Sequence, residues 1–443
     1  MLFHILASAF LLLLLFSHGT QSTRDYLKLQ LHHANNLPSP EQTLAFDSTR
    51  LSYLSSAATT PPNALSAPII SGASSGAGQY FVDFHIGTPP QRIRLVADTG
   101  SDLVWARCSA CRTDCSPRHP PGTSFLPRHS TTFSPFHCYH PACRLVPHPS
   151  RACNRTRLHS PCRYRYSYAD TSSSAGFFSR DVATLNASSG KPARIPDLPF
   201  GCAFNVSAGP GLASAHGVMG LGRGPISFPS HAARRFGNVF SYCLLDYTLS
   251  PPPTSFLLIG DAKKKPKFIP ELSFTPLLSN PVSPTFYYIR ITAASVDGTA
   301  LPIDPDVWAI DPETGNGGTI IDSGTTLSFL PDAAYNQILS AMARKIPEAF
   351  KLSPGPPGFD LCMNASSSGL QMPKLVFKLL GGAVFEPPSG NYFIDAADGV
   401  TCLALQPADS GFGVIGNLMQ QGFLFVFDRD ASRLGFSRNG CAV

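Results

Sequence analysis

The sequence predicts a mainly β protein made of two pseudo-symmetric β-barrel lobes with a cleft between them. Short apolar or alternating segments such as FYYIRITAASV and FLFVFDRDASRLGFS recur between Pro and Gly residues, which is typical of strands joined by turns. The chain of 443 residues is also longer than one hydrophobic core usually supports. A weak internal repeat agrees with two lobes: an Asp loop is followed by an apolar-Gly segment at 98–101 and 218–222, and again at 322–325 and 414–418.

The composition fits a compact globular protein, with 43% hydrophobic and 14% charged residues, and excludes a chain that is disordered throughout. The net charge of +6 comes from scattered residues and from a KKKPK run at 263–267. We interpret that run as a solvated turn, so the charge does not predict a nucleic-acid surface.

The first 22 residues predict a signal peptide. A mostly apolar run from Leu2 to Phe16 is followed by small and polar residues, and it is too short to favour a membrane span. The C-terminal SRNGCAV carries no retention or anchor signal. We therefore expect a soluble, secreted protein without a membrane anchor, in the extracellular space, including the cell wall, or in the vacuole.

Residues 23–75 are expected to be a propeptide and linker, because they are polar and end in a stretch rich in Ser, Ala, Pro and Gly that a protease could cut. Structured sequence is predicted to begin abruptly near Gln79. We expect the N-terminal lobe at 76–265, with the Asp98 loop, a Cys-rich insert and a flap, and the C-terminal lobe at 266–443, with the Asp322 loop.

Local patterns predict the elements around the two loops. Alternation at 80–86 and 93–97, with a turn at 87–91, predicts a β-hairpin that leads into the first Asp loop. A helix is predicted at 332–346, where apolar residues recur at helical spacing after Pro331. We expect this helix to pack behind the second loop.

The two Asp loops carry the predicted chemistry. A single Asp-[Thr/Ser]-Gly segment is usually an ordinary turn, but two copies, each preceded by an apolar strand, are much more specific. Two carboxylates brought together share a proton, because like-charge repulsion raises one pKa. A water held between them can then be deprotonated by one carboxylate while the protonated partner polarises a substrate carbonyl. This chemistry requires no nucleophilic side chain, metal or organic cofactor.

The chain resembles the pepsin-type aspartic proteases, and within them the cysteine-rich plant branch typified by nepenthesin. The resemblance runs from Gln79 to the C-terminus through QYFVDFHIGTPPQ, VADTGSDLVWARC, GVMGLGRGPISFPS, TIIDSGTTLSFLP and GVIGNLMQQGFLFVFD. It implies a bilobal pepsin-like acid protease fold, cleavage of polypeptides at acid pH, and no cofactor.

The same resemblance implies roles for particular residues. Asp98 and Asp322 would be the catalytic pair, and Ser101 and Thr325 would hydrogen-bond their carboxylates. The residues that build the loops would be Thr99, Gly100, Ser323 and Gly324. The flap tyrosine would be Tyr168, followed by Asp170, and Trp105 would be the tryptophan whose indole commonly bonds that tyrosine.

The flap departs from the pattern of the family. Plant relatives usually have YGDGS, whereas this chain has YADTS at 168–172. Loss of both glycines should stiffen the hairpin and shift subsite preference without removing Tyr168.

Twelve cysteines indicate an oxidised protein with up to six disulfides. A zinc site in the CSACRTDC segment is the less favoured alternative, because the nearby histidines are irregularly spaced. We expect a Cys362–Cys402 disulfide in the second lobe, which leaves Cys441 for a partner in the first part of the chain. Four sequons predict glycosylation sites in polar, turn-rich stretches, at Asn154, Asn186, Asn205 and Asn364.

The sequence is compatible with two functions. The first is an active endopeptidase with polypeptide substrates, acting as a monomer and inhibited by its own propeptide until activation. The alternative is a catalytically silent inhibitor or peptide-binding protein on the same fold. The intact Asp loops favour the enzyme.

The Gly-rich segment GLGRGP at 220–225 is expected to be a structural loop beside the site, because it lacks the Lys-[Ser/Thr] of a phosphate-binding loop.

Overall fold

The structure is a computed structural model of the chain. It describes residues 26–33, 39–59, 79–109, 124–147, 160–167, 173–187, 189–207, 215–246, 254–260, 271–352, 354–364, 371–408, 412–438 and 440–441. The predicted signal peptide, the KKKPK run and the flap at 168–172 lie outside these residues.

One large sheet runs through the molecule and joins its two halves. Its strands lie in the order β12-β27-β26-β10-β11-β1-β2-β3-β9-β4-β8-β7-β5, and β6 pairs with β7. The bounds, in that order, are β12 (Ser273–Pro276), β27 (Arg433–Ser437), β26 (Leu424–Asp428), β10 (Val239–Cys243), β11 (Ser255–Ile259), β1 (Leu27–His33), β2 (Tyr80–Ile86), β3 (Gln91–Asp98), β9 (Gly217–Gly220), β4 (Trp105–Arg107), β8 (Pro192–Ser207), β7 (Ser173–Asn186), β5 (Ser134–Pro135) and β6 (Arg163–Ser167).

Three smaller sheets complete the second half. Their strand orders are β13-β16-β25-β17-β24, β15-β14-β20-β21 and β18-β19-β23-β22. The bounds are β13 (Tyr288–Ile289), β14 (Ile291–Val296), β15 (Thr299–Ala300), β16 (Thr319–Ile321), β17 (Ser328–Pro331), β18 (Lys351–Leu352), β19 (Cys362–Asn364), β20 (Leu375–Leu379), β21 (Val384–Phe385), β22 (Phe393–Ala397), β23 (Val400–Leu403), β24 (Leu405–Ala408) and β25 (Gly413–Ile415).

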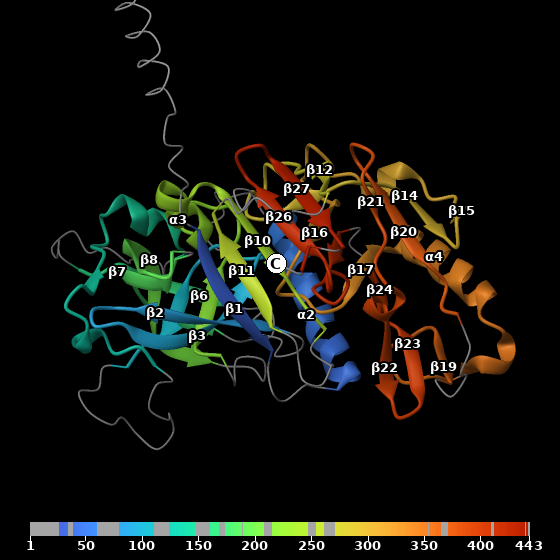
Figure 1. The fold of residues 1–443 in the computed structure, drawn as a ribbon, viewed down its shortest axis with the longest axis horizontal. Helices are drawn as coiled ribbons and strands as arrows, with labels where there is room; N and C mark the ends of the chain where they lie inside the picture. Colours follow the sequence, from blue (N-terminus) through green and yellow to red (C-terminus); the bar gives the residue numbers. More distant parts are fainter. Residues whose placement is uncertain are drawn as a thin grey trace, which may run out of the picture.

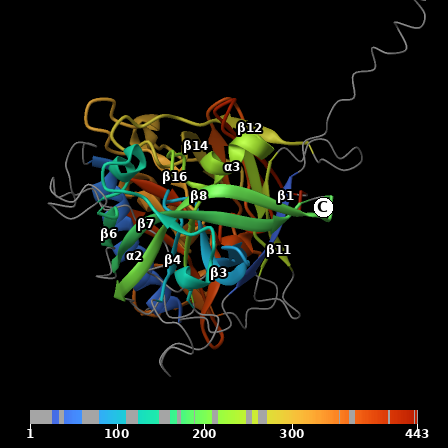
Figure 2. The same ribbon diagram turned by 90° about the vertical axis from the view of Figure 1, so that its left-hand side faces the viewer.

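The sheets form two lobes, as predicted. Figure 1 shows strands of the first half, coloured blue to green, on one side and most strands of the second half, coloured orange to red, on the other. The red strands β26 and β27 join the large sheet between the lobes. The view in Figure 2 shows β7 and β8, the longest strands, crossing the face of the first lobe.

Three α-helices are described: α2 (Pro40–Thr59), α3 (Phe228–Phe236) and α4 (Asp332–Lys345). The helix predicted at 332–346 is confirmed as α4, which contacts β14, β17 and β24. Helix α3 begins at Ser227, whose hydroxyl accepts a hydrogen bond from Ser230 N, and it ends at Gly237 with φ of 95°. Short 3₁₀ helices are η2 (Pro127–His129), η3 (Pro141–Leu145), η6 (Pro305–Trp308), η7 (Glu348–Phe350) and η8 (Ser389–Asn391).

The predicted hairpin is present as β2 and β3, which pair antiparallel. The prediction that structured sequence begins near Gln79 is wrong, because β1 and α2 precede it. Strand β1 lies between β11 and β2, with Leu27, Leu29 and Leu31 buried. The alternation of these leucines with polar residues was a local signal for the strand, and pairing with β11 and β2 buries their side chains.

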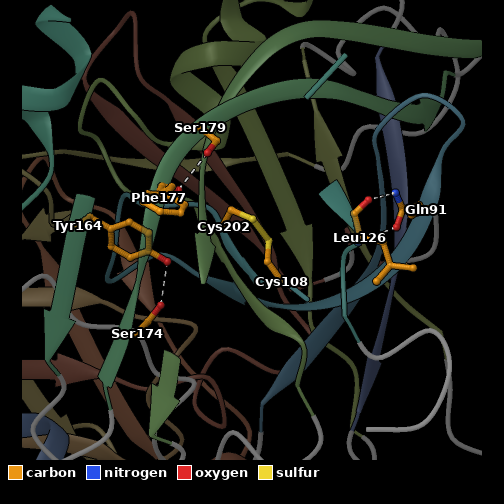
Figure 3. Close-up of a disulfide and its surroundings, with 8 residues drawn as sticks. All are labelled: Gln91, Cys108, Leu126, Tyr164, Ser174, Phe177, Ser179 and Cys202. Atoms are coloured by element: carbon orange, nitrogen blue, oxygen red, sulfur yellow. Dashed lines mark hydrogen bonds between the residues drawn. A yellow bond between two sulfur atoms is a disulfide. The ribbon is translucent and has the colours of Figure 1, made fainter. Parts of the chain in front are cut away.

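Four disulfides join described cysteines. The predicted Cys362–Cys402 bond is present, and Cys441 pairs with Cys243 of the first part. The others are Cys143–Cys162 and Cys108–Cys202; the latter ties the end of β4 to β8, close to the hydrogen-bonded Tyr164 and Ser174 (Figure 3). Since Cys108 is consumed in this way, its thiolate does not serve the alternative zinc site. Within the described residues, no helix is long and apolar enough to cross a membrane.

Candidate active site

The two Asp loops occupy equivalent positions in the two halves. Strand β3 ends at Asp98 and pairs in parallel with β9, so that Asp98 lies opposite Gly220. Strand β16 ends immediately before Asp322 and pairs in parallel with β25. In each half, therefore, the apolar-Gly segment of the sequence repeat lies directly beside the strand that carries the aspartate.

Hydrogen bonds cross between the loops and hold them against each other. Thr99 N donates to Ser323 Oγ at 3.1 Å, and Ser323 N donates to Thr99 Oγ1 at 2.9 Å. Each hydroxyl also donates across the pseudo-two-fold axis, to Ile321 O at 3.2 Å and to Ala97 O at 2.9 Å. This reciprocal set explains why each loop needs a hydroxyl residue directly after its aspartate.

Each carboxylate is held within its own loop by the residues that the sequence singled out. Ser101 Oγ donates to Asp98 Oδ2, and Thr325 Oγ1 donates to Asp322 Oδ2, both at 2.5 Å. Backbone N–H groups of Gly100 and Gly324 donate to the other carboxylate oxygens at 3.1 and 3.0 Å. These geometries agree with the positions expected of a catalytic pair, whose catalytic role stays a prediction.

Glycine at both loop positions is required by the close approach of the two aspartates. A Cβ at Gly100 would lie 2.9 Å from Asp322 Oδ1, and a Cβ at Gly324 would lie 2.3 Å from Asp98 Oδ1. Any larger residue would push the facing carboxylate away.

A guanidinium group lies between the two carboxylates. Arg50 of α2 donates through Nη2 to Asp98 Oδ1 at 3.0 Å and to Asp322 Oδ2 at 2.6 Å. Its Nε donates to Asp322 Oδ2 at 2.9 Å and to Thr325 Oγ1 at 2.7 Å. All three charged side chains are fully buried. Helix α2 therefore occupies the space in which the predicted water and substrate would lie.

The same helix contributes a second contact to the second loop. Asp47, one turn before Arg50, accepts hydrogen bonds from Thr326 N at 3.0 Å and Leu327 N at 2.5 Å. Figure 1 shows α2, in blue, between the two lobes. Asp47 and Arg50 were not predicted as site residues from the sequence. They are three residues apart, which places them on the same helical face, and this spacing was the sequence feature that could have indicated them.

Burial dominates the electrostatics of the site. Burial raises the pKa of Asp98, and the charge of Asp322 adds to the rise, whereas the guanidinium of Arg50 opposes it. Burial also raises the pKa of Asp47 to about 7, although its two backbone hydrogen bonds and Arg50 act against the rise. For Arg50, the effect of burial is outweighed by the charges of Asp322 and Asp98, which raise its pKa.

The segment GLGRGP lies beside the first loop, as predicted. Gly222 N donates to Ser101 O, and Gly224 N donates to the Asp102 carboxylate, both at 2.8 Å. Asp102 also accepts from Thr285 Oγ1 of the second half at 2.8 Å. A Cβ at Gly224 would lie 2.0 Å from Asp102 Oδ2, so this glycine makes room for the carboxylate.

Only some of the other predicted site residues belong to the part of the chain that the structure describes. Trp105 is buried in β4, whereas Tyr168 and Asp170 of the flap lie outside the described residues. Asn186, Asn205 and Asn364 are exposed and lie in β7, β8 and β19, where Asn186 and Asn364 are the last residues of their strands. Asn154 is not among the described residues.

Across the described part of the chain, no group of three or more His, Cys, Asp or Glu residues could hold a metal ion.

Comparison with known proteins relates this site to a family. Models described as xylanase inhibitor N-terminal and C-terminal match residues 80–261 and 286–438. "Aspartyl protease family protein 2" of Arabidopsis thaliana is 37% identical over 385 residues, which cover 86% of this chain and 75% of that protein. "Aspartic proteinase nepenthesin-1" of Nepenthes gracilis is 36% identical over 372 residues, covering 83% of this chain and 79% of that protein.

Among solved structures, the basic 7S globulin of soybean superposes with a TM-score of 0.66 at 20% identity and covers 94% of this chain and 96% of that chain. The structure titled edgp superposes with a TM-score of 0.69 at 21% identity and covers 94% of this chain and 95% of that chain. At this level of identity the likeness concerns the fold alone.

Proposed function

Because the chain belongs to the plant branch of the pepsin-like aspartic proteases, we propose that it is an endopeptidase that hydrolyses peptide bonds at acid pH through Asp98 and Asp322. One observation carries the proposal: the two carboxylates converge so closely that a single nitrogen, Nη2 of Arg50, bonds both of them. Two carboxylates at this separation share a proton once the cation is gone, which divides the roles of acid and base between them.

In the proposed reaction, the ionised carboxylate removes a proton from a water that lies between the two aspartates. The protonated carboxyl donates its proton to the carbonyl oxygen of the scissile peptide, and a tetrahedral diol forms without a covalent enzyme intermediate. The carboxyl that took the water proton then protonates the amine nitrogen, and the other carboxylate accepts a proton from a diol hydroxyl as the C–N bond breaks and the new carboxyl group forms. Ser101 and Thr325 keep each carboxylate in position during these transfers.

The segment before Gln79 is proposed to be an inhibitory propeptide. Arg50 fills the space between the carboxylates, and Leu51 and Leu54 of the same helix are buried in the cluster that contains Leu103 and Phe286. A substrate cannot reach the pair while this helix is bound. Removal of residues up to about 75 is therefore the proposed activation step, with polypeptides as substrates.

The location of the protein belongs to the same proposal. The apolar N-terminal run supports entry into the secretory route, and the four disulfides between described cysteines suit an oxidising compartment. We propose a secreted, glycosylated monomer in the extracellular space or the vacuole. Glycans on Asn186, Asn205 and Asn364 would project from exposed positions.

An inhibitor or peptide-binding protein is the second candidate, because the matching family models are described as xylanase inhibitor domains. The site supports the enzyme instead. Both aspartates, both hydroxyl residues that bond them and the reciprocal contacts between the loops are present.

The test is cleavage of denatured globin by the secreted protein after acid treatment, from about pH 2 to about pH 7, with and without pepstatin. We expect an acid optimum that pepstatin abolishes, together with loss of the propeptide. Asp98→Ala and Asp322→Asn should each abolish cleavage while the circular dichroism spectrum stays unchanged. Substantial activity in either variant would refute the assigned pair, and a folded wild-type protein without activity at any pH would favour the inhibitor.

A further inference from the structure

Two buried tyrosines lie beneath the catalytic loops, one from each half of the chain. Tyr242 belongs to β10 and Tyr287 directly precedes β13; their exposed fractions are 1% and 0%. Neither residue belongs to the Asp loops or to the propeptide. Each hydroxyl is nevertheless hydrogen-bonded to a segment that supports a catalytic loop.

Tyr287, from the second half, supports the first loop. Its hydroxyl donates to Leu221 O at 2.8 Å, and Leu221 N donates to the backbone oxygen of Asp98 at 2.8 Å. The backbone oxygen of Tyr287 accepts from Ile321 N, the residue before Asp322, at 3.1 Å. One residue is therefore bonded to the supports of both aspartates.

Tyr242, from the first half, supports the second loop. Its hydroxyl donates to Gln420 Oε1. Gln420 Nε2 in turn donates to the backbone oxygen of Asp322 at 3.2 Å and to Ile415 O at 2.8 Å. Gln420 Nε2 thus ties Asp322 to the neighbouring strand β25, and Gln420 Oε1 links this contact to Tyr242.

A cluster of aromatic rings fixes the two tyrosines relative to each other. Phe427 of β26 packs against Tyr287 with ring centroids 4.6 Å apart and against Tyr242 at 5.4 Å. Phe240 stacks on the same Phe427 ring at 4.4 Å. Burial raises the pKa of both tyrosines, so both hydroxyls stay protonated and remain donors throughout the acid and neutral range.

We propose that Tyr242 and Tyr287 are a crossed pair of positioning residues, in which the tyrosine of each half holds the catalytic loop of the other half. The consequence for catalysis rests on the proposed function, because neither tyrosine contacts the carboxylates. The structural consequence does not rest on it. Crossing couples the geometry of the pair to the relative placement of the two lobes, and misplacement of reacting groups by a fraction of an ångström is costly.

The first experiment compares processed wild-type protein with Tyr242→Phe, Tyr287→Phe and Gln420→Leu. We expect kcat to fall by roughly tenfold in each variant while KM changes by less than about twofold, because the substrate-binding surface is untouched. Tyr392→Phe is the matched control: Tyr392 is equally buried and its hydroxyl also bonds backbone groups, of Pro373 and Leu375, but these support no catalytic loop.

The second experiment needs no activity and uses amide hydrogen exchange in the full-length chain. Tyr287→Phe should speed exchange at Leu221 N–H, which bonds Asp98 O, by about tenfold or more and leave Asp322 N–H less affected. Tyr242→Phe should produce the reverse pattern, at Asp322 N–H, which bonds Ile415 O. The Tyr392→Phe control should change neither amide.

The outcomes separate this proposal from the proposed function. A crossed exchange pattern in a protein without peptidase activity would support the positioning pair and refute the protease. Faster exchange confined to the loop of the same half, or equal loss of kcat in Tyr392→Phe, would overturn the positioning pair while leaving the protease intact.

Discussion

The two Asp loops are nearly identical around their aspartates but differ four residues further along the chain. At that position the first loop has Asp102, whose buried carboxylate accepts from Gly224 N and from Thr285 Oγ1. The second loop has Thr326, which supplies no carboxylate. Instead, the N–H groups of Thr326 and Leu327 donate to Asp47, which lies on α2.

The first Asp loop is therefore supported by a carboxylate of its own, whereas the second is supported by a carboxylate on α2 that could be removed with the helix. Asp102 and both of its partners lie after Gln79, so the first loop would keep its carboxylate if the proposed propeptide were removed. The second loop receives its carboxylate from the proposed propeptide, because Asp47 lies on α2, the helix that also carries Arg50. Departure of one helix would thus open the catalytic pair and free two backbone donors on the second loop.

The largest effect is expected from Arg50→Ala in the full-length protein. Removing the cation leaves two buried carboxylates facing each other, and breaking a buried ion pair in this way costs about 3–5 kcal/mol. Helix α2 should then dissociate, and the full-length variant should bind pepstatin, as measured by calorimetry. Arg50→Lys, which keeps the charge, is the control. The helix would not be the inhibitor if full-length Arg50→Ala still excluded pepstatin.

A smaller effect is expected from Asp102→Ala, which tests the permanent support. The substitution leaves the partly buried donors Gly224 N and Thr285 Oγ1 without this acceptor, so unfolding free energy should fall by about 1–3 kcal/mol. Guanidinium denaturation should give the same loss before and after propeptide removal. Asp102→Asn, which retains an acceptor oxygen, should lose less. A loss seen only in the full-length protein would contradict the distinction between the two loops.

The smallest effect is expected from Asp47→Asn, and it depends on pH. Burial raises the pKa of Asp47 from 3.8 to about 7, so the bound helix takes up a proton at this carboxyl. Its contribution to unfolding free energy is therefore intact below about pH 4 and declines as the pH rises toward 7. Asn keeps the acceptor oxygen without the charge, so the variant should lose less stability between about pH 4 and 7.

Thermal unfolding of the full-length wild type and Asp47→Asn across this range measures that prediction. Parallel pH profiles of the two proteins would show that Asp47 does not titrate in the bound helix. The processed protein lacks Asp47 and serves as the control, because its pH profile reports only the remaining groups.

The sequence alone was sufficient for the features that are local or repeated. Strict alternation predicted β2 and β3, helical spacing predicted α4, and the repeated Asp loops predicted the paired carboxylates. The family resemblance implied the hydroxyl residues that bond these carboxylates. These features follow from nearby residues, because strand and helix periods and tight turns are set by neighbours in the chain.

Only the tertiary structure could decide what fills the site. Among the side chains of α2 that the structure describes, the buried ones are Thr43, Asp47, Arg50, Leu51 and Leu54, so three of these five are polar. The charged side chains of Asp47 and Arg50 are buried because their partners, Asp98 and residues 322–327, lie far away in the sequence. The crossed tyrosines follow the same rule: a local pattern encodes an element, whereas a buried polar contact between halves exists only after both halves have folded.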